Sequence, residues 1–186
     1  YNYSYRNPAI TKEMTKPDKN ANYVGNCTIN VRALPELLIT EDNNKILYIQ
    51  DDYTNLMIDK SSIVVQEDGV QISSDRLIIN EEDNDTQKSL LFKIIGAKEN
   101  SDYVITYKAE LIANVGETVT YSNYAKILGH EESYVSGKED TVTKEQTSSG
   151  SVTFESLSFK LYKYNSENFA ISLAGAKFKL LDENGN

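Results

Sequence analysis

One strand-like run, residues 119–128, constrains this chain more than any other. In Val119-Thr-Tyr-Ser-Asn-Tyr-Ala-Lys-Ile-Leu128, apolar and polar residues alternate as in a β-strand with one buried face. Asn123 breaks the alternation, because it falls on the apolar face. A buried amide without a hydrogen-bond partner costs free energy. The fold must therefore supply a polar partner for Asn123.

Two other strand-like runs carry a polar residue on their apolar face. Lys12 does so in residues 9–14, and Asp51 does so in residues 46–53. We therefore expect one amine, one carboxyl and one carboxamide in the same core. Burial favours the neutral form of an amine, which is nucleophilic, and the neutral form of a carboxyl, which can donate a proton to a carboxamide oxygen. These groups would allow Lys12 to attack Asn123 and expel ammonia, once per molecule.

Each of the three residues also has an ordinary structural interpretation. Lys12 could extend past Met14 to solvent, with only its aliphatic stem buried. Asp51 could be a turn residue at the end of its strand, and Asn123 could bond only to backbone groups. The residue pattern alone leaves both interpretations open.

Short strand-like segments follow one another along the chain, with turn signals between them and almost no helical periodicity. This pattern predicts an all-β immunoglobulin-like sandwich. Glu67-Asp-Gly69 predicts a hairpin turn, and residues 35–39 predict a short turn or helix. The expected strands are 9–14, 26–33, 45–51, 61–66, 69–73, 76–80, 89–95, 102–112 and 118–128.

Composition excludes several functions. The 186 residues include 19 Lys and Arg against 28 Asp and Glu, a formal charge of −9, which argues against nucleic acid as a partner. No apolar run approaches the roughly 18 residues of a membrane span, so we expect no membrane contact. Cys27 is the only cysteine, which precludes an internal disulfide and predicts a small buried side chain.

We expect neither a metal nor a cofactor. His130 is the only histidine and has no cysteine pair to join it, so it receives no metal-binding or catalytic role. The acidic stretch 80–85 is expected to be a solvated loop, and whether it binds calcium stays open.

The pattern divides the chain into four parts. Residues 1–8 look like a leader or linker, 9–130 form the first domain, 131–150 form a polar hairpin or linker, and 151–186 start a second β-sandwich domain. The chain lacks an initial Met and stops within an apparent turn, so we expect a fragment of a longer protein.

The order and spacing of several segments resemble the collagen-adhesin A-type immunoglobulin-like domains of Gram-positive surface proteins. The resemblance implies an isopeptide bond between Lys12 on the first strand and Asn123 on the last. It also implies an assisting acid on a middle strand, Asp51, with Asp52 as the alternative. The matching segments are Ile10–Lys12, Cys27–Val31, Leu47–Asp51, Leu56–Val65, Asp102–Tyr107 and Tyr121–Ala125.

The C-terminal part resembles the opening of a collagen-adhesin B-type (SpaA-like, prealbumin-like) domain, through Phe159–Tyr164 and Leu173–Phe178. In that family the lysine matching Lys163 forms an isopeptide bond, but its partners would lie beyond residue 186. We therefore expect Lys163 to stay a free amine. We also expect residues 151–186 to pack on the first domain or to associate with another copy of the chain.

These resemblances imply a structural or adhesive module of a cell-wall-anchored, extracellular protein that is not a turnover enzyme. Its partners would be a host extracellular-matrix protein or other surface-protein domains. Two alternatives stay open: an adhesin domain that binds a matrix protein through tyrosine-rich faces, and a carbohydrate-binding module with an exposed aromatic platform. A hydrolase is disfavoured, because only His130 is available for a triad and no paired inward carboxylates stand out.

Overall fold

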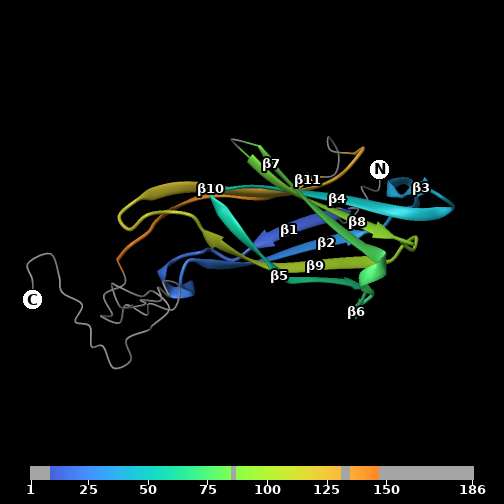
Figure 1. Cartoon of the computed structure of the whole chain (residues 1–186), viewed down its shortest axis with the longest axis horizontal. Helices are drawn as coiled ribbons and strands as arrows, with labels where there is room; N and C mark the ends of the chain where they lie inside the picture. The colour runs from blue at the N-terminus through green and yellow to red at the C-terminus, as the bar shows by residue number, and fades with distance from the viewer. Residues whose placement is uncertain (1–8, 85–86, 131–134, 147–186) are drawn as a thin grey trace, which may run out of the picture. The chain divides into compact units, whose positions relative to one another are not determined.

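The computed structural model describes residues 9–84, 87–130 and 135–146. These residues form two antiparallel β-sheets that enclose one core (Figure 1), so the predicted all-β sandwich is confirmed. The expectations for residues 1–8 and 151–186, including Lys163 and the second domain, lie outside the described residues.

The smaller sheet has five strands in the order β1-β2-β9-β5-β6. The larger sheet has the order β11-β10-β4-β8-β7, and β3 pairs with β4 beside this path. In chain order the strands are β1 (Ile10–Met14), β2 (Val24–Arg32), β3 (Ile39–Glu41), β4 (Asn44–Thr54), β5 (Leu56–Glu67), β6 (Val70–Gln71), β7 (Leu77–Asn84), β8 (Gln87–Ile95), β9 (Asp102–Leu111), β10 (Thr118–Ile127) and β11 (Val135–Thr143). Three 3₁₀ turns connect them: η1 (Lys19–Ala21), η2 (Pro35–Leu37) and η3 (Ser74–Arg76).

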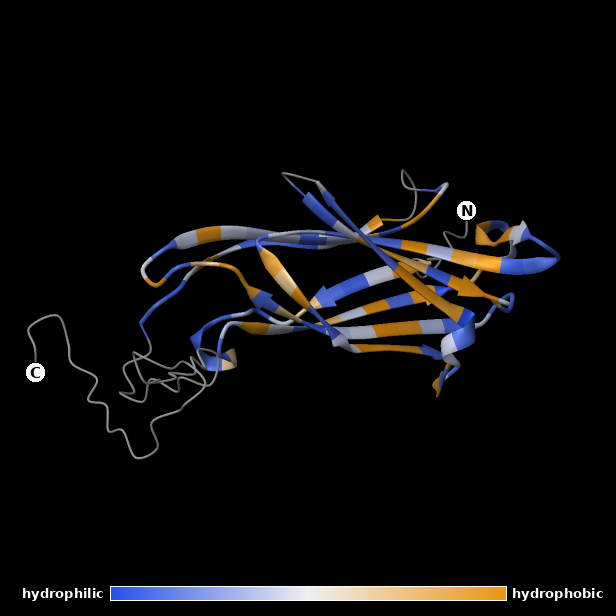
Figure 2. Ribbon diagram, in the orientation of Figure 1, coloured by the Kyte–Doolittle hydropathy of each residue, from blue (hydrophilic) through white to orange (hydrophobic). Residues whose placement is uncertain are grey.

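Period-two patterning explains why these segments form strands. In β9 every second residue from Tyr103 to Leu111 is buried, and Figure 2 shows hydrophobic and hydrophilic residues alternating along the ribbons. A fully buried large apolar side chain contributes about 1.5–3 kcal/mol. The largest fully buried side chains come from both sheets and from the turn η2: Ile29, Leu37, Ile46, Leu47, Ile49, Tyr53, Leu56, Leu90, Phe92, Ile94, Tyr103 and Tyr121.

Local turn chemistry sets two of the connections. Asp68 and Gly69 both have positive φ, 49° and 81°, as the predicted hairpin between β5 and β6 requires. Asn55 adopts φ 53° between β4 and β5, where the chain leaves one sheet for the other.

The expectation of a solvated acidic loop at residues 80–85 is wrong for residues 80–84, which belong to strand β7. The strand tolerates its acidic residues because cations lie opposite. The Asp83 carboxylate is 2.8 Å from Lys88 Nζ, and Glu81 pairs with Lys60. These ion pairs lie at the surface, and Glu81, Glu82 and Asp83 stay exposed to solvent, as the composition indicated.

The placement of Asn123 on the last strand also needs correction. Asn123 lies on β10, and β11 follows it along the outer edge of β10. Apolar alternation did not reveal β11 because Val142 is its one buried residue. A continuous antiparallel backbone ladder joins the two strands, and hydroxyl pairs add to it, such as Thr118 with Thr143 at 2.8 Å.

Candidate cross-linking site

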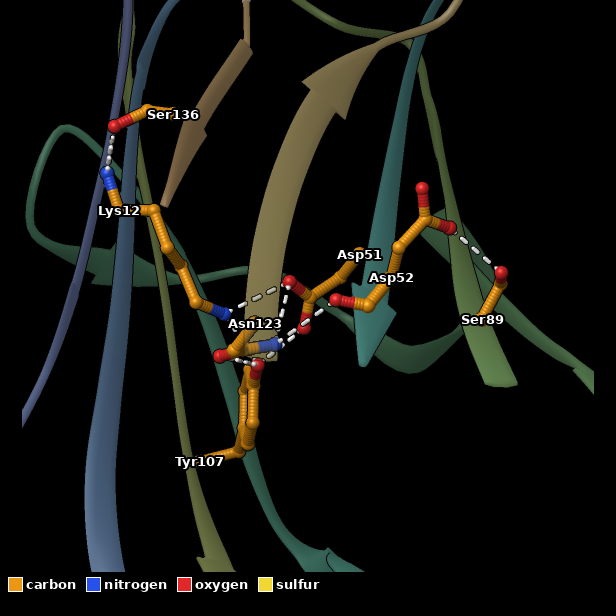
Figure 3. Close-up of polar contacts among 7 residues, drawn as sticks. All are labelled: Lys12, Asp51, Asp52, Ser89, Tyr107, Asn123 and Ser136. Atoms are coloured by element: carbon orange, nitrogen blue, oxygen red, sulfur yellow. Dashed lines mark hydrogen bonds and ion pairs between the residues drawn. The ribbon is translucent and has the colours of Figure 1, made fainter. Parts of the chain in front are cut away.

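Three strands bring Lys12, Asp51 and Asn123 together between the sheets (Figure 3). Lys12 lies on β1 in the smaller sheet, whereas Asp51 on β4 and Asn123 on β10 lie on neighbouring strands of the larger one. Asp51 pairs with Ala125, so Asn123 is its diagonal neighbour on the same face. The three residues are 8%, 0% and 2% exposed, which excludes the solvent-directed conformation considered for Lys12.

One carboxylate oxygen links the amine to the carboxamide. Asp51 Oδ1 lies 2.8 Å from Lys12 Nζ and accepts a hydrogen bond of 3.1 Å from Asn123 Nδ2. A buried charge is tolerated only with such partners. Asn123 Nδ2 also points to the backbone carbonyl of Asp52, at 3.5 Å. Because both neighbours of this nitrogen are acceptors, the amide orientation is fixed.

Tyr107 is a fourth member of the site that the sequence interpretation missed. Its hydroxyl accepts a hydrogen bond from Lys12 Nζ, contacts Asp51 Oδ2 and lies 3.1 Å from Asn123 Oδ1. The Lys12 amine is also 4.5 Å from the centre of the tyrosine ring, within cation–π range. The inward phase of Tyr107 in β9 was readable, and a buried hydroxyl needs a partner.

The electrostatics of the pocket keep Tyr107 and Cys27 protonated. Burial, followed by the negative charge of Asp51, raises the pKa of Tyr107 well above its usual value. Burial also raises the pKa of the Cys27 thiol to about 11, against the opposing charge of Lys12. Tyr107 is therefore a hydrogen-bond donor at neutral pH, and Cys27 is a neutral packing residue, buried as predicted.

Asp52 points away from the pocket. Its carboxylate accepts hydrogen bonds from Ser89 at 2.6 Å and Gln50 at 2.7 Å, and lies 2.8 Å from Lys126 Nζ. Burial alone would raise the pKa of Asp52, but hydrogen bonds from Lys126, Ser89 and Gln50 lower it overall. Of the two aspartates considered as the acid, only Asp51 directs its carboxyl at Lys12 and Asn123.

Strand β11 covers the open side of the site. The backbone N–H of Lys12 donates to Ser136 Oγ at 2.9 Å, which ties the edge of one sheet to the edge of the other. A Cβ on the neighbouring Gly137 would lie 2.2 Å from the backbone oxygen of Asn123. Gly137 therefore permits the close approach of β11 to β10.

Within residues 9–84, 87–130 and 135–146, no three His, Cys, Asp or Glu side chains are grouped as a metal site would require. No helix in the described part of the chain has the length and apolar character needed to cross a membrane.

Comparisons with known proteins agree in fold but not in sequence. No protein-family model and no curated protein matches the chain. Among solved structures, the major pilin SpaA of Corynebacterium diphtheriae matches with a TM-score of 0.50 and 15% identity, over 70% of this chain and 36% of the pilin. The work on that pilin describes a modular pilus assembly with stabilising isopeptide bonds.

Two further matches among solved structures have lower TM-scores. The collagen-binding domain of a Staphylococcus aureus adhesin gives a TM-score of 0.45 and 14% identity, over 75% of this chain and 99% of that domain. The pneumococcal major pilin RrgB gives 0.41 and 18%, over 67% of this chain and 23% of the pilin.

The described residues therefore share an all-β sandwich fold with the pilin SpaA. The chain spans about a third of the length of SpaA. At this level of identity the likeness concerns the fold alone.

Proposed function

We propose that this chain is a structural or adhesive module of an extracellular, cell-wall-anchored Gram-positive protein, and that an isopeptide bond between Lys12 and Asn123 closes its sandwich. One observation carries the proposal: in a buried pocket, Asp51 Oδ1 contacts both the amine of Lys12 and the carboxamide of Asn123. A structural core does not require this combination, whereas amide exchange does.

The reaction needs no group from outside the chain. Transfer of one proton from Lys12 to Asp51, along the 2.8 Å contact, converts the ion pair into a neutral amine and a neutral acid. The amine then attacks Cγ of Asn123. Asp51 returns its proton to Nδ2 of Asn123 and takes one from Nζ of Lys12, so that the C–N bond to Nδ2 breaks and ammonia leaves. Asp51 ends protonated, as it was at the moment of attack.

The proposed bond would join β1 of the smaller sheet to β10 of the larger one. The two sheets could then no longer separate without breaking a covalent bond. Such a closure suits a module that carries load or resists proteolysis outside the cell, where the proposed partners are other surface-protein domains or a matrix protein.

The described surface lacks the tyrosine-rich faces and the exposed aromatic platform on which the two alternative functions depended. Tyr124 is the most exposed of the described tyrosines, at 38%. The buried ones, Tyr23, Tyr53, Tyr103, Tyr107 and Tyr121, point into the sandwich. The tyrosine content of residues 9–84, 87–130 and 135–146 therefore builds the core rather than an aromatic binding platform.

Intact mass and protease resistance together test the proposal. Wild-type protein should be lighter than its sequence mass by one ammonia and should resist proteolysis. Asn123→Ala should have its full sequence mass and be cleaved faster. A folded wild-type protein with its full sequence mass would refute the cross-link. If the wild-type protein is linked, wild type and Asn123→Ala can each be displayed on a Gram-positive cell wall. Comparing how long the two proteins survive there then tests the surface role.

A further inference from the structure

We propose that Tyr107 positions and activates the Asn123 carbonyl for the cross-linking reaction, a role that rests on the proposed function. Asp51 then serves only the two nitrogens. The argument starts from the two ends of the Asn123 carboxamide, which face different groups in the pocket (Figure 3).

The nitrogen end faces Asp51 and the oxygen end faces Tyr107. Nδ2 lies 3.1 Å from Asp51 Oδ1, and Oδ1 lies 3.1 Å from the Tyr107 hydroxyl. Asp51 Oδ1 also contacts the attacking amine of Lys12. Asp51 is therefore placed to move protons between the incoming and the departing nitrogen, and the Tyr107 hydroxyl is the donor nearest the oxygen on which negative charge develops.

The Tyr107 hydroxyl has one hydrogen and two acceptors, Asp51 Oδ2 and Asn123 Oδ1. While Asp51 is ionised, its carboxylate is the stronger acceptor and holds this hydrogen. When Asp51 takes the proton from Lys12, it becomes a weaker acceptor, and the hydroxyl hydrogen can turn to Asn123. The proton transfer that makes the amine nucleophilic thus also frees the donor that polarises the carbonyl.

Tyr107 keeps its hydrogen throughout this cycle. Lys12 attacks Cγ, Oδ1 gains negative charge and is stabilised by the Tyr107 O–H, and collapse of the intermediate releases Nδ2 as ammonia. The tyrosine neither gains nor loses a proton overall, so the balance of the reaction is unchanged.

The decisive experiment compares the linking rates of Tyr107→Phe and Tyr121→Phe. Each protein is made by cell-free synthesis, synthesis is stopped, and the loss of ammonia is followed by intact mass over time. Tyr121 is a matched control, since it is fully buried on β10 two residues from Asn123, and its hydroxyl has no hydrogen-bond partner among the described residues. Tyr121→Phe should link at the wild-type rate, and Tyr107→Phe on the order of 100-fold more slowly, as when an oxyanion donor is removed.

A site-specific 3-fluorotyrosine at position 107 separates activation from packing. This residue keeps the ring but has a more acidic hydroxyl, so the protein that carries it should link at least as fast as wild type. The same protein tests the proposal if Tyr107→Phe does not fold. Equal rates for Tyr107→Phe and Tyr121→Phe, or slower linking with fluorotyrosine, would overturn the proposed role of Tyr107 but leave the cross-link standing. A wild-type protein that never loses ammonia would overturn the cross-link itself and this role with it.

Discussion

The energetic effect of the proposed bond can be isolated by making Asn123→Ala in two backgrounds. In wild-type protein the substitution removes both the bond and the local contacts of Asn123. In Lys12→Met, which has no amine to link, it removes the local contacts alone. The difference between the two costs is the contribution of the bond.

The structure sets the size of each term. Asn123 makes two side-chain hydrogen bonds of 3.1 Å, which are worth about 1–3 kcal/mol together. The bond would close a loop of roughly 110 residues, and a disulfide that closes about 100 residues constrains the unfolded chain by about 4–5 kcal/mol. Asn123→Ala should therefore cost about 5–8 kcal/mol in wild type and about 1–3 kcal/mol in Lys12→Met.

Guanidinium unfolding of the four proteins, each checked by intact mass, measures both costs. A coupling of about 4–5 kcal/mol is the expected result. Equal costs in the two backgrounds would show that no covalent closure stabilises the fold, and the entropic reasoning would be refuted.

Three further perturbations follow from the same contacts. Asp51→Ala should fold but keep its full sequence mass, because the acid is missing. Asp52→Ala should lose one ammonia like wild type, because the Asp52 carboxylate faces Lys126 outside the pocket. Intact mass measures both, and the reverse result would show that the acid is misassigned. Glu67 is a pH-dependent stabiliser: burial opposes its ionisation, but hydrogen bonds from Arg76, Lys98 and Tyr103 lower its pKa to about 2 from 4.5. The stability that ionised Glu67 contributes should therefore be complete above about pH 4.5 and lost as the pH falls toward 2. Urea unfolding should show that the free energy of unfolding of Glu67→Gln falls less than that of wild type over this pH range. An equal fall in both proteins would contradict this. Under force applied through the termini, residues before Lys12 and after Asn123 lie outside the covalent loop. Single-molecule pulling should therefore extend only residues 9–11 and 124–146 of the sandwich, by no more than about 90 Å. Release of residues 12–123 would exclude the bond.

The sequence predicted those parts of the site that break a pattern. A charged or amide residue on the apolar face of a strand stands out, which is how Lys12, Asp51 and Asn123 were found. Tyr107 did not stand out, because tyrosine fits an apolar face as well as a polar one, and its partners come from three other strands. Which groups its hydroxyl meets is a property of the sandwich and not of β9.

The two segments that alternation did not reveal as strands share one cause. Both β7 and β11 are edge strands, and each is largely polar. Edge strands bury little, so their stability comes from cross-strand hydroxyl and charge pairs that no periodicity reveals. The central strands were predicted because each buries one face in the core and leaves the other more exposed, which imposes alternation on the sequence.

The most direct test of the cross-link is a tryptic digest of the wild-type protein analysed by tandem mass spectrometry. Trypsin does not cut at a linked Lys12 or between Lys16 and Pro17. The bond therefore predicts one branched species, in which residues 7–19 are joined through Lys12 to residues 109–126 through Asn123, with the loss of one ammonia. Free peptides 7–12, 13–19 and 109–126 in quantitative yield from folded protein would contradict it.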